Sequence, residues 1–398
     1  MSSLPRSDRI AGLRPTAVNA VLAEAREVQS EREAKSKDVK LVSLMRGEPD
    51  FPTPAHIVEA AAAAMRNGRT NYPDNRGEKN FREAVTLKLE RDNKIRFDPS
   101  TEVIATTGAT FGIHAALTSI LNDGDEVLLP DPVYDAYQSP IRLAGGVIRS
   151  VPSHLENGRF VLDIDALETL ACDRTKLLIL NTPWNPTGTV LRRQELDRIA
   201  DFCIRHNLIL LSDEIYEAIT YDGAEHVSPL AARPDLRDRY IHINSLSKTY
   251  SMTGWRVGYC AGPREIIQAM FMVLAQSSRG PATFIQDAAT AALTRPQDCV
   301  CNMRSEYARR RAAALHALEG LPRVRALPPE GGFFVMADVR GLDQPSDAIR
   351  RKLLRDHGVV VIHGSAYGPA GEGTLRVSFA SGGENLTEGL KRLREGLA

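Results

Sequence analysis

Between about residues 100 and 260, short β-branched runs alternate with amphipathic helical stretches, and this alternation constrains the fold more than any other feature. The runs are EVIATTG, DEVLLP, GGVIRSVP, KLLILN, LILLSDE and YIHINS. The stretches between them, such as ATFGIHAALTSILN and RQELDRIADFCIRHN, repeat apolar residues at three and four positions, as crossover helices do. Strands that alternate with helices form a mostly parallel sheet wrapped by helices. The sequence therefore predicts an α/β fold.

The pattern changes after about residue 290. A long charged helix around MRSEYARRRAAALHALEG is followed by GGFFVMADV, a further helix, VVVIHG and TLRVSFA, which indicates a smaller α+β domain. A chain of 398 residues also exceeds what one hydrophobic core usually organises. We expect an N-terminal arm that joins the small domain (1–48), a large domain (49–290) and the rest of the small domain (291–398), with a cleft between the two domains.

The N-terminal arm is predicted to hold a helix near AVNAVLAEAREVQSE, followed by the irregular loop MRGEPDFPTP. The charged run EAREVQSEREAKSKDVK is either a binding surface or, as is more common, a solvated helical face. The first residues, MSSLPRSDRIAG, lack the apolar core of a signal peptide, and no later stretch reaches the ~18 to 20 apolar residues of a membrane span. We therefore expect a cytoplasmic protein without a membrane partner.

Composition favours a small-molecule partner. Lys plus Arg and Asp plus Glu both number 50, so there is no net field to hold a nucleic acid. The five cysteines are an odd number and include no CxxC pair, which argues against a disulfide framework and against a thiolate metal site. We expect reduced thiols and no metal.

Ligands of open parallel sheets bind beyond the carboxyl ends of the strands, so the residues that end each run are the first candidates. Gly108, Ala109 and Thr110 end one run and open a helix, which suits a bound phosphate, although a glycine before a helix is commonly only a turn. Asp213 ends an apolar run and needs a cationic partner there, unless it is a helix N-cap. Tyr216, three residues on, could reach the same cleft.

The segment SLSKTYSMTGWRVGY is the most specific feature of the chain. A lysine in such a loop beside a buried cleft, here Lys248, can lose its proton through desolvation and become a nucleophilic amine. Arg256 can hold a phosphate with two hydrogen bonds, and Ser245 can add a hydroxyl. A lone lysine or arginine is usually a surface residue. Their occurrence together with Asp213 and Gly108 at successive strand ends favours a functional site.

The lysine segment resembles that of the class I aminotransferases, through SLSK (245–248) and MTGWRVG (252–258). Further motifs match in the same order, from about residue 40 to the C-terminus: RGEPDF (46–51), NYPDNRGEKNFREAV (71–85), TTGAT (106–110), DPVYDAY (131–137), NTPWNPTG (181–188), SDEIY (212–216) and LRVSFA (375–380). The resemblance implies the fold type I of enzymes that use pyridoxal 5′-phosphate (PLP), which has a mostly parallel seven-stranded sheet in the large domain and a smaller α+β domain.

Roles around the cofactor ring follow from the resemblance, residue by residue. It implies that Lys248 holds PLP as a Schiff base and then moves the α-proton of the substrate. Asp213 is implied to pair with the pyridine nitrogen, which keeps the ring an electron acceptor. Tyr216 and Asn185 are implied to hydrogen-bond the phenolic oxygen, and Tyr134 to stack on the ring. Tyr134 could also be an ordinary packed aromatic.

The resemblance also implies where the phosphate and the substrate bind. The phosphate would be held by residues at the helix start and on the lysine segment: Gly108, Ala109, Thr110, Ser245 and Arg256. Tyr72 is implied to reach the cofactor phosphate of a neighbouring subunit, which implies a homodimer with shared active sites, unless it is a plain surface residue. Arg376, unless it is a strand-edge charge, would bind the substrate α-carboxylate, with the Gly47 backbone and Asn185 nearby.

The chain departs from the family pattern at three places, two of which concern the rim of the pocket. The chain has HGSAYG (363–368) where relatives often have PGSAFG, and Trp184 precedes the asparagine of NTPWNPTG. Arg279 replaces a small polar residue that relatives often have near the neighbouring subunit's site. It is either a surface residue or a ligand for a distal acidic group of the substrate.

The function implied is transfer of an α-amino group from an L-amino acid to a 2-oxo acid by a ping-pong mechanism. A PLP-dependent lyase or decarboxylase of the same fold is the nearest alternative, because the choice of bond depends on which Cα substituent stands perpendicular to the ring. A non-catalytic PLP-binding regulator is disfavoured, since the chain has no basic DNA-binding segment before Gly47.

Overall fold

The computed structural model describes residues 7–34 and 40–398, and its largest sheet has seven strands. In spatial order these are β2 (Val103–Thr106), β10 (Gly258–Ala261), β9 (Tyr240–Ser245), β8 (Ile209–Asp213), β7 (Thr175–Asn181), β3 (Glu126–Pro130) and β4 (Val147–Val151). Only β10 among them pairs antiparallel, with β2 and with β9. The predicted seven-stranded, mostly parallel sheet is confirmed, and all six runs form strands of it.

Helices cover both faces of this sheet because neighbouring residues of each buried strand point to opposite sides. Leu178 and Leu180 of β7 belong to one core, and Leu177 and Ile179 belong to the other. The first core includes residues of α3 (Ala55–Arg66), α4 (Lys79–Lys88), α8 (Arg193–Arg205) and α12 (Thr283–Thr294). The second includes residues of α5 (Ala109–Ile120), α6 (Gln138–Leu143) and α11 (Arg264–Ala275).

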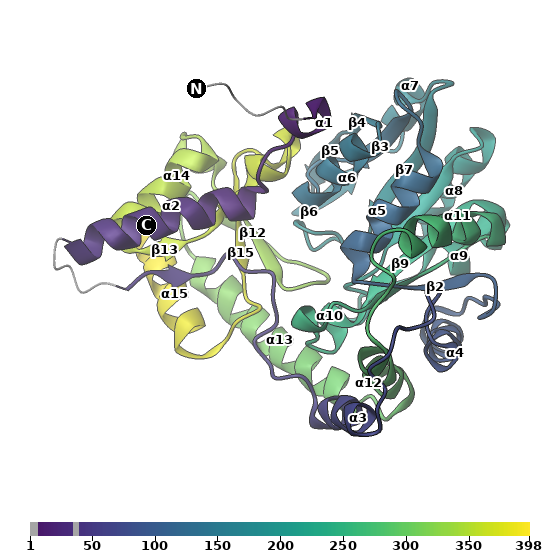
Figure 1. The fold of residues 1–398 in the computed structure, drawn as a ribbon. Coiled ribbons are helices and arrows are strands. Elements are labelled where there is room, and N and C mark those ends of the chain that lie inside the picture. The colour runs from purple at the N-terminus through teal and green to yellow at the C-terminus, as the bar shows by residue number, and fades with distance from the viewer. Residues whose placement is uncertain (1–6, 35–39) are drawn as a thin grey trace, which may run out of the picture.

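A second sheet lies beside the first, with four antiparallel strands (Figure 1). Its order is β11 (Arg325–Leu327), β12 (Phe334–Asp338), β15 (Thr374–Ser378) and β14 (Ile362–His363). It packs with α13 (Asp298–Leu318) and α15 (Gly383–Leu397), and α14 (Ser346–Lys352) lies nearby. Strand β1 (Val42–Ser43) pairs with β13 (Val359–Val360), so the N-terminal segment joins this part. The division at residues 48 and 290 stays a prediction.

The remaining elements are short. They are the hairpin strands β5 (Ser153–Glu156) and β6 (Arg159–Leu162), the helices α7 (Ala166–Leu170), α9 (Pro229–Ala232) and α10 (Leu246–Thr249), and the turns η1 (Leu89–Asn93), η2 (Asp135–Tyr137), η3 (Pro234–Arg239), η4 (Thr253–Trp255), η5 (Arg340–Leu342), η6 (Leu353–His357), η7 (Gly364–Tyr367) and η8 (Pro369–Gly371). Neither the hairpin nor β10 was among the predicted strands.

The N-terminal arm bridges the two parts of the chain. The short helix α1 (Asp8–Ala11) contacts α6, whereas α2 (Ala17–Ala34) contacts β14 and η6 and lies along the C-terminal part in Figure 1. Val21, Ala25 and Val28 of α2 are buried there. The charged run at 24–40 is in part a solvated face, but Glu24 forms an ion pair with the buried Arg350, and residues 35–39 lie outside the described residues.

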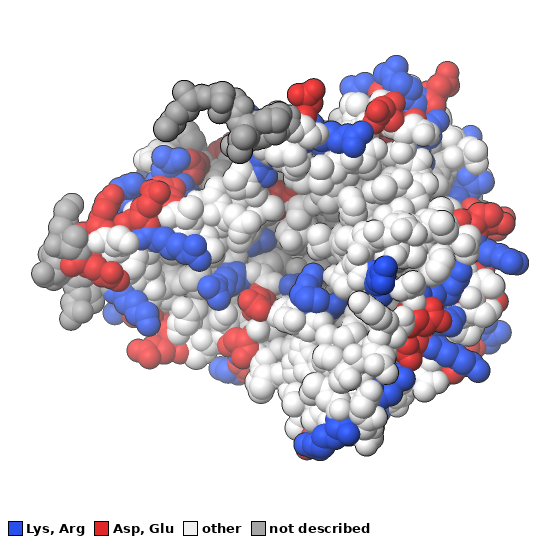
Figure 2. Space-filling view, in the orientation of Figure 1, with Lys and Arg blue, Asp and Glu red and all other residues white. Residues whose placement is uncertain are grey.

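The surface carries both signs of charge. Figure 2 shows basic and acidic side chains interspersed over one face of the molecule. No helix within the described ranges is both long and apolar enough to cross a membrane. All five cysteines are free thiols, as predicted.

Candidate functional site

A cavity of about 420 Å³ lies at the carboxyl ends of the strands, between the large sheet and the second sheet. Eleven of the thirteen predicted site residues line it: Gly47, Ala109, Thr110, Tyr134, Asn185, Asp213, Tyr216, Ser245, Lys248, Arg256 and Arg376. They come from segments far apart in sequence, and strand topology brings them together, because parallel strands end at the same edge of a sheet.

Lys248 lies on α10, immediately after β9 ends. Its Nζ donates a hydrogen bond to the backbone oxygen of Gly47 at 2.5 Å and lies 5.8 Å from the centre of the Phe333 ring. Burial lowers the pKa of Lys248 to about 8, and the nearby guanidinium groups of Arg376 and Arg256 contribute. A substantial fraction of this amine is therefore neutral, and nucleophilic, near neutral pH.

Asp213 is the last residue of β8 and is only 3% exposed. Its Oδ2 accepts a hydrogen bond from the Tyr137 hydroxyl at 2.6 Å, and its Oδ1 accepts one from the Ile215 N–H at 3.3 Å. Burial raises the pKa of Asp213 to about 6 despite these two donors. No helix begins within the three residues after Asp213, so it is not a helix N-cap. Its carboxyl faces the cavity and lacks a cationic partner among the described residues of its own chain.

An anion-binding corner forms where β2 meets α5. Gly108 precedes α5 with a φ of +83°, and a Cβ there would lie 2.7 Å from Nη2 of Arg256, so only glycine lets the guanidinium approach the helix start. The backbone N–H groups of Ala109 and Thr110 open the helix beside it. Ser245 contributes a hydroxyl that already accepts the Ser247 N–H. This donor set fits the phosphate of PLP, and the uncompensated Asp213 carboxyl fits its pyridine nitrogen.

Arg376 lies on β15, an interior strand, and is only 2% exposed, so it is not a strand-edge charge. It donates hydrogen bonds to Oδ1 of Asn185 at 3.2 Å and to the Met45 backbone oxygen at 2.7 Å. The guanidinium also lies 4.1 Å from the centre of the Phe334 ring. Its Nε is buried and has no hydrogen-bond partner among the described residues. A bound carboxylate would complete the site.

Two predicted residues do not line the cavity. Gly108 contacts the guanidinium of Arg256, which itself lines the cavity. Tyr72 is 86% exposed, and its ring centre is 5.6 Å from the guanidinium carbon of Arg279, which is also exposed. Within one chain, neither Tyr72 nor Arg279 reaches the cavity, and their predicted roles concern a second subunit.

The two expected changes at the rim have different outcomes. Trp184 does not line the cavity; it is buried in the core of the large sheet. Tyr367, the tyrosine of HGSAYG, is buried with its ring centre 4.9 Å from the Arg376 guanidinium carbon. It therefore lies behind Arg376 and does not line the cavity.

Sequence reasoning missed several residues that line the cavity: Thr16, Val18, Asn19, Ile113, Asp135, Tyr137, Asn181, Ile215, Ser247, Thr253 and Phe334. Asn181 was detectable, because it ends the run KLLILN; its side chain bonds the Asp213 backbone oxygen and the Asn185 N–H. Tyr137 stood in the quoted motif DPVYDAY, but nothing in its spacing connects it to Asp213. Thr16 and its neighbours reach the cavity only because α2 packs across to the second sheet.

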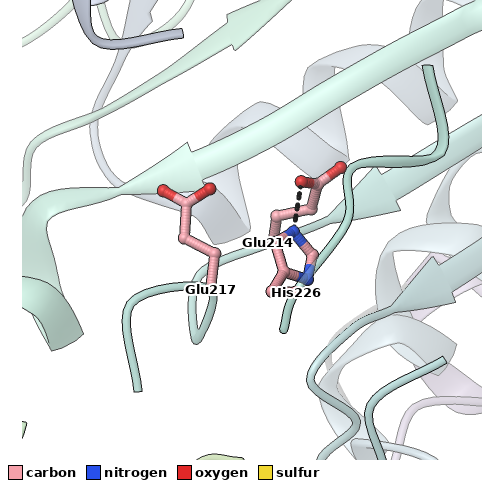
Figure 3. Close-up of side chains that lie close together, drawn as sticks. All are labelled: Glu214, Glu217 and His226. Atoms are coloured by element: carbon pink, nitrogen blue, oxygen red, sulfur yellow. Dashed lines mark hydrogen bonds and ion pairs between the residues drawn. The ribbon is translucent and has the colours of Figure 1, made fainter. Parts of the chain in front are cut away.

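A second cluster of ionisable groups lies beyond Asp213, away from the cavity. Figure 3 shows the His226 imidazole bonded to Glu214, with Glu217 beside them. Their potential ligand atoms lie within 4.8 Å of one another. Protein donors already satisfy both carboxylates: Lys88 and Asn93 bond Glu217. Glu214 accepts from a second group of donors, namely Ser212, Ser228 and Tyr240.

Charge balance in this cluster points to a structural role. Burial raises the pKa of Glu214, but the nearby His242 and His226 outweigh it and hold the pKa well below its ordinary value. Lys88 lowers the pKa of Glu217 against the effect of burial in the same way. The cluster is therefore a buried ion network beneath the β8 end.

Replacing Lys88 by methionine is expected to lower the free energy of unfolding by about 3 to 5 kcal/mol, because it leaves Glu217 buried without its cation. Urea unfolding followed by circular dichroism measures the loss. Lys79→Met is the matched control, since the Lys79 side chain is 79% exposed and its pair with Glu83 contributes little. A loss below about 1 kcal/mol for Lys88→Met would contradict the assignment of this network.

Comparisons with known proteins agree with this site. The family described as aminotransferase class I and II matches residues 39–393. An aspartate aminotransferase of Pyrococcus abyssi is 41% identical over 366 residues, which cover 91% of this chain and 92% of that protein. An aromatic-amino-acid aminotransferase of Thermococcus litoralis is 38% identical, over 98% of this chain and 97% of that protein. The solved structure of an aspartate aminotransferase single mutant from Thermus thermophilus has a TM-score of 0.90 at 36% identity and covers 100% of both chains.

The family match spans nearly the whole chain, and the cavity holds a nucleophilic lysine, a buried carboxyl and a phosphate-type corner together. The chain therefore belongs to the class I and II aminotransferases, enzymes that use pyridoxal 5′-phosphate as their cofactor.

Proposed function

We propose that this aminotransferase binds PLP covalently through Lys248 and moves the α-amino group of an L-amino acid to a 2-oxo acid in two half-reactions. The observation that carries the proposal is the position of Lys248. Its Nζ lies in one cavity with the Asp213 carboxyl, the anion-binding corner at Gly108 and the buried Arg376.

PLP supplies an electron sink that makes the Cα proton of an attached amino acid removable. Lys248 would act as the base that takes this proton from the substrate Cα and as the acid that gives it back, and its lowered pKa suits both roles near neutral pH. Asp213 keeps the pyridine nitrogen protonated, and Tyr137 holds the Asp213 carboxyl in place through its hydroxyl. The supporting observation is that Asp213 is buried and lacks a cation among the residues described for its own chain.

The other cavity residues orient the cofactor and the substrate. Tyr216, Asn185 and Tyr134 all line the cavity. Tyr216 and Asn185 would bond the phenolic oxygen of the cofactor, and Tyr134 would contact its aromatic ring. The phosphate is held by residues at two strand ends: Gly108, Ala109, Thr110, Ser245 and Arg256. Arg376 binds the α-carboxylate of the substrate beside Gly47. The carboxylate accepts a hydrogen bond from Nε, which has no other partner among the described residues. Closure of the part that carries Arg376 would exclude water from the site.

We further propose a homodimer with shared active sites in the cytoplasm. Tyr72 contacts the cofactor phosphate of the other subunit. The surface around Tyr72 supports a dimer, because it exposes large apolar side chains: Tyr72 is 86% exposed and Met272 is 54% exposed. Arg76 lies over Phe271 and Arg279 over Tyr72, so the two segments form one surface.

Reaction type is tested by following single half-reactions of the PLP-loaded enzyme. With an L-amino acid alone, we expect one equivalent of the matching 2-oxo acid per site, without release of ammonia or CO2. Pyruvate or 2-oxoglutarate should then regenerate the starting absorption spectrum. Continuous release of ammonia or CO2 would instead identify a lyase or a decarboxylase. A panel of aspartate, aromatic, neutral and basic donors defines the substrate range.

A further inference from the structure

One charged residue of the cavity has no part in the chemistry proposed above. Asp135 follows Tyr134 and begins η2, and it is 9% exposed. Its Oδ2 accepts the N–H of Ala17, the first residue of α2, at 2.5 Å. Its Oδ1 is buried and has no hydrogen-bond partner within residues 7–34 and 40–398. Asp135 therefore holds the N-terminal arm with one oxygen, and its other oxygen lacks a donor within the described ranges.

Among the described residues, Asp135 is the one charged residue of the cavity lining to which the proposed function assigns no role. Five charged residues line the cavity: Asp135, Asp213, Lys248, Arg256 and Arg376. The proposed function, on which this step rests, assigns four of them to the cofactor ring, its covalent link, its phosphate and the substrate α-carboxylate. Within one chain, the charge left for the substrate side chain is negative, because Arg279 lies outside this cavity. No cation of the described chain is left in this cavity for a second carboxylate.

A buried carboxylate oxygen without a donor is unfavourable unless a ligand supplies the donor. Burial raises the pKa of Asp135. The Ala17 N–H, the charge of Arg376 and the nearby backbone N–H groups of Asp135 and Ala136 only partly oppose this effect. A cation brought by a ligand would stabilise the ionised form. Val18 and Ile113 also line the cavity and suit the methylene stem of a long side chain, and the polar Thr16 and Asn19 line it as well.

We propose that Asp135 binds the terminal cation of a basic amino donor, such as lysine, ornithine or arginine, and that this carboxylate selects against dicarboxylic donors. A basic donor would lie between Arg376, which holds its α-carboxylate, and Asp135. Because the same carboxyl also accepts the Ala17 N–H, such a donor binds against the arm that covers the cavity.

The test compares donors of matched length with one 2-oxo acid acceptor. We expect the best basic donor to exceed norleucine in kcat/KM by about tenfold or more, since a hydrogen bond to a charged group commonly contributes at least that factor. The dicarboxylic donor aminoadipate should have a lower kcat/KM than norleucine. Asp135→Asn keeps an acceptor for the Ala17 N–H but removes the charge, so the ratio of basic to neutral donor should fall by about tenfold.

Binding is measured separately from turnover, by calorimetry on the PLP-loaded enzyme. In the wild type, 6-aminohexanoate should bind about tenfold more tightly than hexanoate, and Asp135→Asn should remove the difference. Asp173→Asn, on an exposed turn, makes the same change in net charge and should preserve both ratios. Because the two ligands are compared on the wild type, this result does not depend on the folding of the variant.

Three results would overturn the inference. They are equal kcat/KM values for basic and neutral donors, a preference for aminoadipate, and a loss in Asp135→Asn that is the same for every donor. The third would leave Asp135 as an anchor of α2 only. Failure of every donor to transfer its amino group would count against the proposed function instead.

Discussion

Replacing Lys248 by alanine is expected to lower kcat for amino transfer by at least about 10⁴-fold, the upper range for removal of a positioned acid and base. The variant loses both the nucleophile that binds PLP and the group that moves the Cα proton. Steady-state kinetics with a saturating donor measures the loss. Borohydride treatment of the PLP-loaded wild type should reduce the covalent link and label Lys248, which peptide mass spectrometry locates.

Two controls separate the chemistry from a general disturbance. Lys248→Arg retains a positive charge but stays protonated, so it should be as inactive as the alanine variant. Lys176→Ala, at a partly exposed position outside the cavity, should keep its activity and its label. A Lys248→Ala enzyme with more than about 1% of wild-type kcat, or a label on another lysine, would refute the proposed role.

Asp213→Asn should lower kcat by about 10²-fold or more and weaken PLP binding. Removing one member of a buried, hydrogen-bonded charge pair costs about 3 kcal/mol or more. The carboxamide cannot balance the charge of the pyridine nitrogen, whereas it can still accept the Tyr137 O–H. Spectrophotometric titration of the apoenzyme with PLP gives the affinity, and single half-reactions give the rate. Unchanged affinity and rate would show that the pyridine nitrogen binds elsewhere.

The pH dependence of PLP binding has a defined direction. Burial raises the pKa of the Asp213 carboxyl to about 6 in the absence of the cofactor. The carboxyl gains a proton as the pH falls through about 6, so PLP affinity should fall more steeply there in the wild type than in Asp213→Asn, which retains the pH dependence of the Lys248 amine. Tyr137→Phe removes one donor and keeps the charge, so its kcat should fall by only about tenfold.

Local sequence was sufficient for much of the sheet and of the site. Runs such as KLLILN and LILLSDE are short and largely apolar, and they alternate with longer amphipathic stretches, which together favour buried strands. Strand ends of a parallel sheet share one edge, so Asp213, Ser245 and Gly108 could be placed together without coordinates. Lys248 followed from the motif around it.

Other parts of the fold were not decided locally. Residues 258–261, GYCA, are too few to indicate a strand, and they become β10 because they pair with β2 on one side and β9 on the other. The hairpin of β5 and β6 was missed because each strand has only four residues, and Phe160 and Leu162 are the buried ones among them.

By itself the sequence determined the α/β class, the seven-stranded sheet expected from the family, and the role proposed for Lys248, because those depend on local periodicity and on motifs of neighbouring residues. Only the tertiary structure decided which distant groups share the cavity. The Tyr137 hydroxyl lies on Asp213, the arm at Thr16 closes over the site, and one oxygen of Asp135 is left without a donor among the described residues. Such contacts depend on how helices and sheets pack across large sequence separations, and hydrogen-bond satisfaction is a property of the packed interior rather than of any segment.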